Sequence, residues 1–345
     1  MKNKILTGLL LVLIGGWGSL SARNVGSNYA RQVNTLIGTK GVGLTSGYLY
    51  PGATYPYGMV QFTPSYFSKR SGFVINQLSG GGCEHMGNFP TFPVKGKLKM
   101  SPDNILNYRI NISEEKGHAG YYEAKVQEDI HAKLTVTERT GMASYEYPAD
   151  QQYGTVIIGG GISATPIEQA AIVITAPNKC EGYAEGGNFC GLRTPYKVYF
   201  VAEFDTDALE SGTWKRDELK PNTTFAEGEY SGVYFTFDVN KKKNIQYKIG
   251  VSYVSVENAR ENLKAENTGW DFLQIQNQAE SKWNHYLGKI EVEGTNPDRT
   301  TQFYTHLYRS FIHPNVCSDV NGEYMGADFR VHKSRSKHYT SFSSR

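Results

Sequence analysis

The chain has 345 residues, of which 39% are hydrophobic and 20% charged, a composition typical of a globular protein with more than one core. Its formal net charge is only +3, and its basic residues are scattered apart from the run Lys241–Lys243. This charge pattern argues against a nucleic-acid partner, because nucleic-acid-binding proteins concentrate basic residues on one surface.

The first residues have the pattern of a secretory signal peptide. Two lysines in Met1–Lys4 precede the apolar run Ile5–Ile14, and small residues follow at Ser19, Ser21 and Ala22. The apolar run is short for a membrane-spanning helix, and no cysteine near the cleavage region indicates a lipoprotein anchor. We therefore expect cleavage after residue 22 and an exported protein, periplasmic or secreted, with no membrane association afterwards.

Residues 23–256 have the composition of an antiparallel β-sandwich. Short runs rich in tyrosine, valine, isoleucine, phenylalanine and threonine are separated by glycine, proline, asparagine and aspartate. Within residues 131–138, apolar and polar residues alternate with a period of two, as in a strand with one buried face. The predicted strands are Met59–Thr63, Pro93–Met100, Tyr121–Gln127, His131–Glu138, Met142–Tyr147, Thr155–Gly159, Tyr196–Phe204, Gly232–Asp238 and Gln246–Val254.

The four cysteines are compatible with disulfide bonding in an exported protein. Cys180 and Cys190 flank a glycine-rich segment whose ends could meet, so we predict this pair, although sequence alone does not fix the Cα geometry. No Cys-x-x-Cys or His-x-x-x-His spacing indicates zinc.

The segment from Leu78 to Asn88 is the best candidate for a ligand-binding loop. Its consecutive glycines let the backbone approach a ligand closely, and its polar side chains offer the donors and acceptors that a sugar requires. A tight structural turn with solvated side chains is the alternative. The candidate substrate-binding residues here are Ser79, Gly80, Gly81, Glu84, His85 and Asn88.

Aromatic residues gather just before this loop, around Pro51-Gly52 and Pro56. Aromatic faces can stack on sugar rings, but so dense a cluster favours a local core. Arg70 nearby is a candidate binder of anions or hydroxyls, with a solvated arginine as the alternative. The aromatic residues are Tyr48, Tyr50, Tyr55, Tyr57, Tyr66 and Phe67.

After Val256 the pattern becomes helical. Apolar residues return every three or four positions from Phe272 to Tyr286, after a break at Asn267–Gly269. We expect a helical linker over residues 257–289, packed against the sandwich.

Residues 290–345 begin a second helical region. Asn296 caps a helix whose first turn holds Pro297 and Asp298, and Pro314 forbids its continuation, which predicts a helix from about Pro297 to His313. Its apolar stripe requires partner helices, and the chain supplies none after it. We therefore expect Phe303, Leu307 and Phe311 to lack partners, and this region to be sensitive to proteases or to drive association.

The loop after this helix is rich in polar side chains from Asp319 to His332. Residues 319–323 resemble the first positions of a calcium-binding EF-hand, but the glycine falls at the fourth position instead of the sixth, and Arg330 stands where glutamate is required. An EF-hand is therefore excluded, and a solvated polar loop is the alternative.

Several separated motifs, in the right order, resemble glycoside hydrolase family 92, whose members are calcium-dependent, inverting, exo-acting α-mannosidases. The motifs similar to the start of its catalytic domain are Phe303–Asn315, Ser318–Tyr324 and Gly326–Asp328. Those similar to its N-terminal domain are Val33–Gly38, Pro51–Gln61 and Leu78–Cys83. The resemblance covers essentially everything after the signal peptide.

This resemblance implies that residues 290–345 begin an (α/α)6 barrel and that the loop at Leu78–Asn88 lies near the active-site pocket. It adds Asp328 to the candidate substrate-binding residues and implies a mannose-containing glycan as partner. Glu84 and His85 depart from the family pattern, which leaves the sugar preference open.

In the family, the segment that corresponds to Tyr339–Ser343 continues into sugar-binding residues, the catalytic acid and base, and the calcium ligands. Here Ser343 is followed only by Ser344 and Arg345, so we expect no catalytic or metal-ligating residue in this chain, and calcium is implied by the family alone. We expect the chain to be inactive by itself. The alternative is a carbohydrate-binding sandwich module without catalysis, and the sequence says nothing about the oligomeric state.

Overall fold

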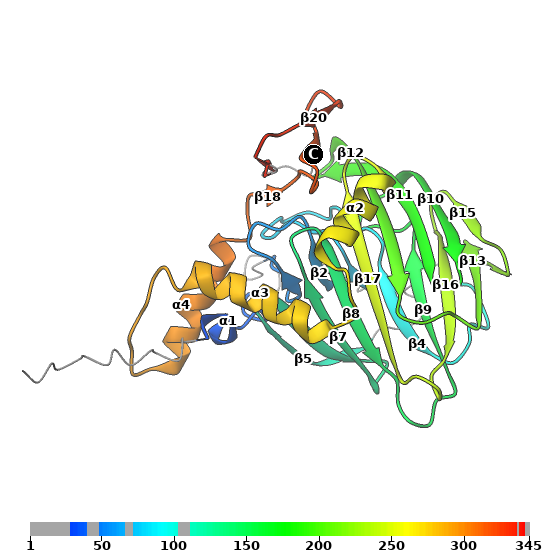
Figure 1. Cartoon of the computed structure of the whole chain (residues 1–345), viewed down its shortest axis with the longest axis horizontal. Helices are drawn as coiled ribbons and strands as arrows, with labels where there is room; N and C mark the ends of the chain where they lie inside the picture. The colour runs from blue at the N-terminus through cyan, green and yellow to red at the C-terminus, as the bar shows by residue number, and fades with distance from the viewer. Residues whose placement is uncertain (1–27, 40–47, 66–71, 103–110, 337, 342–345) are drawn as a thin grey trace, which may run out of the picture.

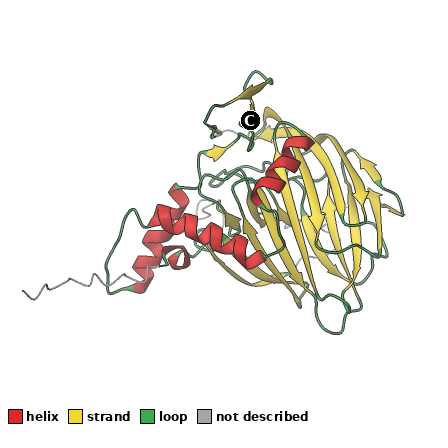
Figure 2. Ribbon diagram, viewed as in Figure 1, coloured by secondary structure: helices red, strands yellow, loops and turns green. Residues whose placement is uncertain are grey.

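A computed structural model of the chain describes residues 28–39, 48–65, 72–102, 111–336 and 338–341. Two large antiparallel sheets face each other, with helices on one side of the sandwich and over one of its faces (Figures 1 and 2). The predicted signal peptide and Arg70, Tyr66 and Phe67 lie outside the described residues.

Within the described residues, the first sheet has eight strands and the second has nine. In spatial order, the first contains β1 (Ala53–Thr54), β2 (Gln61–Pro64), β3 (Phe73–Val74), β4 (Thr91–Lys95), β9 (Tyr153–Gly159), β16 (Ser231–Asp238), β13 (Glu210–Lys215) and β14 (Glu218–Pro221). The second contains β15 (Phe225–Glu227), β10 (Ile167–Ala176), β11 (Lys179–Phe189), β12 (Leu192–Phe204), β17 (Asn244–Ser252), β8 (Thr140–Glu146), β7 (Ile130–Val136), β6 (Tyr121–Val126) and β5 (Ile112–His118).

The core lies between the two sheets and is rich in aromatic side chains. Phe204 of one sheet and Phe235 of the other have ring centroids 4.9 Å apart, and Phe73 stacks on Tyr145 across the same layer at 6.3 Å. These rings are fully buried. Burial of each such side chain contributes roughly 1.5–3 kcal/mol, which explains why aromatic strand residues favour this architecture.

The predicted fold class is confirmed, since the chain is mainly β with an antiparallel sandwich followed by the start of a helical region. Every predicted strand overlaps an observed one, although the strand predicted over Pro93–Met100 is Thr91–Lys95. The hairpin of β10 and β11 was not predicted. In β11 the residues that face the core include small ones such as Gly182 and Ala184, which give a weak hydrophobic alternation.

The predicted pairing of Cys180 with Cys190 is wrong. These residues lie at opposite ends of the extended strand β11, so about 30 Å of backbone separates them at the usual rise per residue. Cys190 instead forms a disulfide with Cys83, whereas Cys180 is a free thiol buried in the core.

The linker forms two helices with a break between them, as predicted at Asn267–Gly269. Helix α2 (Val256–Glu266) begins at its N-cap Ser255 and packs on the outer face of the nine-stranded sheet, where Ala259 and Leu263 contact Val201. Helix α3 (Phe272–Leu287) begins at its N-cap Asp271 and packs against the short helix α1 (Tyr29–Gln32) and against strands β6, β7 and β8 of the nine-stranded sheet.

Glu280 of α3 joins three elements. Its carboxylate accepts hydrogen bonds from Gln276 (2.7 Å), from His118 of β5 (2.9 Å) and from Arg31 of α1 (3.1 Å). Burial alone would raise the pKa of Glu280, but these hydrogen bonds outweigh it and lower the pKa to about 2.

Helix α4 (Pro297–Ser310) begins where predicted and ends before His313, with Phe311 as its C-cap. The expectation that its stripe lacks partners is wrong, because α1 and α3 cover it. The cluster that joins them contains Ala30, Val33, Tyr50, Ala119, Trp283, Leu287, Tyr304, Tyr308 and Ile312, with Phe303, Leu307 and Phe311 half-buried against it.

Polar contacts reinforce this cluster. Trp283 Nε1 donates to the carbonyl oxygen of Thr54 (2.7 Å), and the hydroxyls of Thr54 and Tyr308 are 2.8 Å apart. The Arg309 guanidinium donates to the carbonyl oxygens of Tyr50 (3.1 Å) and Thr35 (2.7 Å). The end of α4 is therefore fixed to the sandwich.

The residues after α4 form two small two-stranded sheets. One pairs β18 (Asn315–Val316) with β21 (Thr340–Ser341), and the other pairs β19 (Glu323–Met325) with β20 (Val331–Lys333). They lie at one end of the sandwich, beyond α2 (Figure 1). Among the described residues, no helix combines the length and apolar character that crossing a membrane requires.

Candidate functional site

The glycine-rich loop, residues 78–88, connects β3 to β4 in the eight-stranded sheet. Its Cys83 is joined by the disulfide to Cys190, which lies in the turn between β11 and β12 of the other sheet. The loop is therefore attached to both sheets of the sandwich.

Two histidines hold the start of the loop. The backbone amide of Leu78 donates to His85 Nε2 (2.7 Å), and the next amide, of Ser79, donates to His313 Nε2 (3.0 Å). The Gly80 amide donates to the Tyr48 carbonyl oxygen (2.8 Å). Burial lowers the pKa of both His85 and His313, which favours the neutral imidazoles that can accept these hydrogen bonds.

Asn88 holds the other end of the loop. Its Oδ1 accepts hydrogen bonds from Asn76 Nδ2 (3.0 Å) and the Tyr196 hydroxyl (2.7 Å), and its backbone amide donates to Asn76 Oδ1 (2.8 Å). Asn88 is fully buried, so its contacts are with the protein interior.

The predicted loop residues thus divide into two groups. Gly80 and Glu84 are exposed, and Ser79 and Gly81 are half-buried, so these four lie at the surface where a ligand can reach them. His85 and Asn88 are buried and form the support beneath.

Asp328 lies on the turn between β19 and β20 and is exposed. Its carboxylate accepts a hydrogen bond from His332 Nε2 (2.9 Å), and this pairing is the first cause of the lowered pKa of Asp328. The candidate Arg70 lies outside the described residues.

A pocket of about 220 Å³ lies between this turn and the sandwich. Tyr196 and Tyr253 line it on the sandwich side, and Met325, Gly326 and Phe329 line it on the other, together with Glu185, Pro195 and Lys197. The Tyr196 hydroxyl bonds to Asn88, so one side chain contacts both the pocket and the glycine-rich loop. The loop and the β19–β20 turn are therefore neighbours around Tyr196.

Sequence reasoning missed Tyr196, Tyr253 and His313 as parts of this site. Tyr196 was predicted only as a strand residue, and nothing in its spacing separates it from the other strand tyrosines. His313 precedes Pro314 at the end of a helical pattern, which offered a weak signal of a special role.

The polar loop after α4 is only partly solvated, because Asp319 is fully buried. Its carboxylate accepts hydrogen bonds from the Ser252 hydroxyl (2.7 Å), Asn258 Nδ2 (2.8 Å) and Asn262 Nδ2 (2.6 Å). Burial raises the pKa of Asp319, and the hydrogen bonds and nearby Arg139 oppose that shift. Asp319 therefore fixes this loop to β17 and α2.

Arg139 makes a second connection between the same parts. Its Nη1 donates to Glu266 Oε1 of α2 (2.7 Å), and its Nε donates to the Ser318 carbonyl oxygen (2.6 Å). The second carboxylate oxygen of Glu266 accepts from the Thr137 hydroxyl (2.6 Å) and the Arg139 amide (2.8 Å). The β7–β8 turn, α2 and the region after α4 thus meet at one buried ion pair.

The described residues do not fit a calcium site. They contain no group of three or more histidine, cysteine, aspartate or glutamate side chains that could hold a metal. The most buried carboxylate, Asp319, is surrounded by hydroxyl and amide donors, which complement an anion and oppose a cation.

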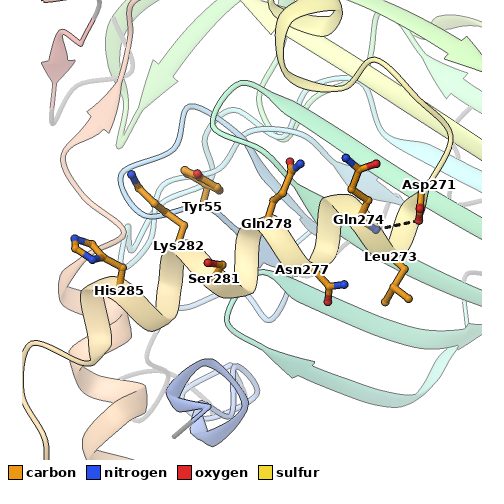
Figure 3. A pocket seen from close by; sticks show the side chains of 9 residues that line it. All are labelled: Tyr55, Asp271, Leu273, Gln274, Asn277, Gln278, Ser281, Lys282 and His285. Carbon is orange, nitrogen blue, oxygen red and sulfur yellow. Dashed lines mark hydrogen bonds between the residues drawn. The ribbon is translucent and has the colours of Figure 1, made fainter. Parts of the chain in front are cut away.

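A second hollow follows one face of α3. Gln274, Gln278 and Lys282 project from the side of the helix on which Tyr55 lies (Figure 3). The remaining lining residues are Asp271, Leu273, Asn277, Ser281 and His285. This open groove is lined mainly by polar side chains.

Comparison with known proteins establishes the family. The profile described as the glycosyl hydrolase family 92 N-terminal domain matches residues 32–252, and that of the family 92 catalytic domain matches residues 258–344. The chain therefore belongs to glycosyl hydrolase family 92.

Known relatives match most of this chain, and the solved structures among them share its fold. An uncharacterized secreted glycosidase from Arthroderma benhamiae is 26% identical, over 91% of this chain and 45% of its own length. A family 92 α-mannosidase from Bacteroides thetaiotaomicron matches with a TM-score of 0.80 at 24% identity, over 91% of this chain and 45% of that one. An inverting mannosidase from the same organism also has a TM-score of 0.80 at 24% identity, over 94% of this chain and 45% of that one. This chain spans about half the length of these relatives.

Proposed function

We propose that this chain forms the β-sandwich side of a sugar site in an α-mannosidase of family 92 that acts on mannose-containing glycans. Two solved relatives are named as an α-mannosidase and an inverting mannosidase, and another structure of the former contains mannoimidazole. On this proposal, residues 23–256 form the sandwich domain, 257–289 the helical linker, and 290–345 the start of the catalytic domain.

One observation carries the proposal: the glycine-rich loop contacts a residue within the catalytic-domain match. The Ser79 amide donates to His313 Nε2 (3.0 Å), which joins residues matched by the two separate family profiles. The loop offers an exposed Glu84 carboxylate, an unobstructed backbone at the exposed Gly80 and the hydroxyl group of the half-buried Ser79. These groups suit a polyhydroxylated ligand, because sugar hydroxyls both donate and accept hydrogen bonds.

The hydrolysis itself is proposed to need residues beyond those of this chain. An inverting glycosidase uses one carboxylic acid to protonate the leaving oxygen and a second carboxylate, roughly 6.5–9.5 Å away, to activate water. On this proposal, neither carboxylate belongs to this chain and calcium is held by other residues of the enzyme, since the described residues contain no group of three or more histidine, cysteine, aspartate or glutamate side chains that could hold a metal. We therefore propose that residues 23–345 do not hydrolyse mannosides by themselves.

Export is part of the same proposal. The N-terminal pattern predicts a signal peptide, and one relative is named a secreted glycosidase. Mannose-containing glycans outside the cytoplasm would then be accessible to the protein, whether it is periplasmic or secreted.

The second candidate function is a carbohydrate-binding sandwich without catalysis. The attachment of the loop to both sheets, through the Cys83–Cys190 disulfide and Asn88, favours it, since the loop support lies largely within the sandwich. Calorimetric titration of residues 23–345 with mannose and with mannobiose tests binding. Heat of binding supports a sugar site on this chain, and its absence for both sugars contradicts one.

A matched pair of glycine variants locates that site. Gly80 and Gly96 both have left-handed backbones, with φ of 77° and 73°, and a Cβ at either meets no atom within 4 Å. Gly80→Ala and Gly96→Ala therefore carry similar backbone strain, but only the first places a methyl group on the proposed sugar surface. We expect Gly80→Ala to weaken mannose binding and Gly96→Ala to leave it unchanged. Equal effects would contradict a site at the loop.

A further inference from the structure

The start of the glycine-rich loop has an unusual support, in which two consecutive backbone amides each donate to a histidine ring. Leu78 donates to His85 Nε2 (2.7 Å) from within the same loop, and Ser79 donates to His313 Nε2 (3.0 Å), which is 234 residues away in the sequence. The two histidines come from different family-matched regions. The loop is thus held both by the region that matches the N-terminal domain and by the region that matches the catalytic domain.

These contacts require a specific form of each imidazole. A ring nitrogen that accepts an amide hydrogen carries no hydrogen itself, so the ring must be neutral with its hydrogen on Nδ1. His85 Nδ1 lies 2.6 Å from the Cys83 carbonyl oxygen, to which only an N–H can donate. His313 has a hydrogen bond with the Asn315 side chain. Each ring is therefore held in an orientation that presents Nε2 to the loop.

The packing around His85 is equally specific. A Cβ on Gly81 would lie 2.8 Å from His85 Cε1, so only glycine lets the loop pass this close to the ring. On its other side, the His85 ring makes an edge contact with Phe189, with centroids 5.5 Å apart. Phe189 is next to Cys190, so the ring lies beside the disulfide.

We propose that His85 and His313 are positioning residues that hold the Leu78 and Ser79 amides and thereby fix the surface of Ser79–Gly81 for the sugar. The role in sugar binding rests on the proposed function, whereas the fixing of the loop does not. His85 fixes the loop within the sandwich, and His313 fixes it to the catalytic-domain region. Loop order thus depends on contact between the two regions.

This arrangement makes the loop sensitive to acid. On protonation, Nε2 becomes a donor that faces another donor, and the hydrogen bond is lost. Among the described residues, the groups that face the rings include the Phe189 ring, the Cys83 carbonyl, the Asn315 side chain and the other imidazole, while Glu84 is exposed to solvent. Burial lowers the pKa of both rings, so the support is complete above the ordinary histidine pKa of about 6.5 and is lost as the pH falls through the lowered value.

Hydrogen–deuterium exchange of the Leu78 and Ser79 amides tests the proposal without any ligand. His313→Leu removes the acceptor, whereas His313→Gln replaces it with an amide oxygen at similar reach that does not titrate. At pH 7 we expect His313→Leu to speed exchange at Ser79 roughly fivefold to tenfold, as the loss of one hydrogen bond implies, and His313→Gln to retain most of the protection. The exposed His306 provides a matched control as His306→Gln, with no expected change.

The pH dependence of amide exchange provides a second measurement, which does not require His313→Leu to fold. Protection at Ser79, corrected for intrinsic exchange, should fall in the unmodified chain as the pH is lowered below the ordinary histidine pKa of about 6.5, and should stay level in His313→Gln. Unchanged exchange in His313→Leu, or equal loss in the leucine and glutamine variants, would overturn the role of the acceptor. The role of the acceptor would also be overturned if exchange at Ser79 depended on pH in His313→Gln as it does in the unmodified chain.

Mannose titration separates this proposal from the proposed function. If the unmodified chain binds mannose, His313→Leu should raise the Kd and His313→Gln should restore it. Binding that His313→Leu leaves intact, despite faster exchange, would refute the link between loop order and sugar binding. A protected loop in a chain that binds no mannose would contradict the proposed function and leave the fixing of the loop supported.

Discussion

Replacing Arg139 with methionine should destabilise the chain more than any surface ion-pair variant. The Arg139 side chain is only 6% exposed and that of Glu266 only 14%, and their charged atoms are 2.7 Å apart. Arg139→Met keeps the aliphatic length, but it leaves the Glu266 carboxylate and the Ser318 carbonyl oxygen without the guanidinium. The sandwich, α2 and the region after α4 all lose a shared contact.

The expected cost is about 3 kcal/mol. Removing one partner of a buried pair costs roughly 3–5 kcal/mol, because the remaining charge is left uncompensated. The lower end applies here, since Glu266 keeps its hydrogen bonds from the Thr137 hydroxyl and the Arg139 amide. Glu266→Gln in the Arg139→Met background should recover part of the loss, because it removes the unpaired charge.

Urea unfolding followed by fluorescence provides the free energy of unfolding. The matched control is Arg193→Met, which breaks the Arg193–Glu168 pair, with contacts at 2.9 Å and side chains 71% and 40% exposed. Solvent screens that exposed pair, so its loss should destabilise the chain far less than Arg139→Met does. Two results would refute the reasoning about burial. One is that Arg139→Met costs no more free energy of unfolding than Arg193→Met. The other is that the costs of Arg139→Met and Glu266→Gln are simply additive in the double variant.

Three further predictions concern the disulfide, an acidic group and proteolysis. Cys83→Ala with Cys190→Ala should lower the free energy of unfolding by roughly 2–4 kcal/mol, as is typical of a native disulfide, and an unchanged urea midpoint would contradict it. The stabilisation that ionised Glu280 contributes is complete above about pH 4.3, the pKa of glutamate in the unfolded chain, and is lost as the pH falls toward about 2. Glu280→Gln should therefore flatten the dependence of the free energy of unfolding on pH in that range. Parallel pH profiles of the variant and the unmodified chain would refute this. Trypsin should cut after the exposed Lys289 well before Arg309, whose guanidinium bonds to backbone carbonyls, and mass spectrometry showing the reverse order would contradict the packing of α4.

Local patterns were sufficient to predict most of the fold. The alternation at Ala132, Leu134 and Val136 correctly indicated a strand with one face in the core. The Asn296 cap and Pro297 correctly placed the start of α4, because both act within a single helical turn. Strands rich in small residues, such as β11, escaped prediction because their inward side chains contribute little hydrophobicity.

Long-range pairing could not be predicted. The Cys83–Cys190 disulfide joins residues 107 positions apart, and no spacing rule distinguishes it from the incorrect Cys180–Cys190 pair. The loop motif was visible in the sequence as a possible ligand site, but the division between its exposed Glu84 and its buried His85 depends on the tertiary fold. Asp319 is a further example, since the polar composition around it predicted solvent and the structure buries it.

We propose above that the glycine-rich loop belongs to the sugar site of a family 92 mannosidase and that this chain does not hydrolyse a mannoside by itself. The direct measurement is release of the aryl group from an aryl α-mannoside by purified residues 23–345, with calcium present and with calcium removed by a chelator. We expect no release above the uncatalysed rate in either condition. Calcium-dependent turnover that copurifies with the chain would contradict it.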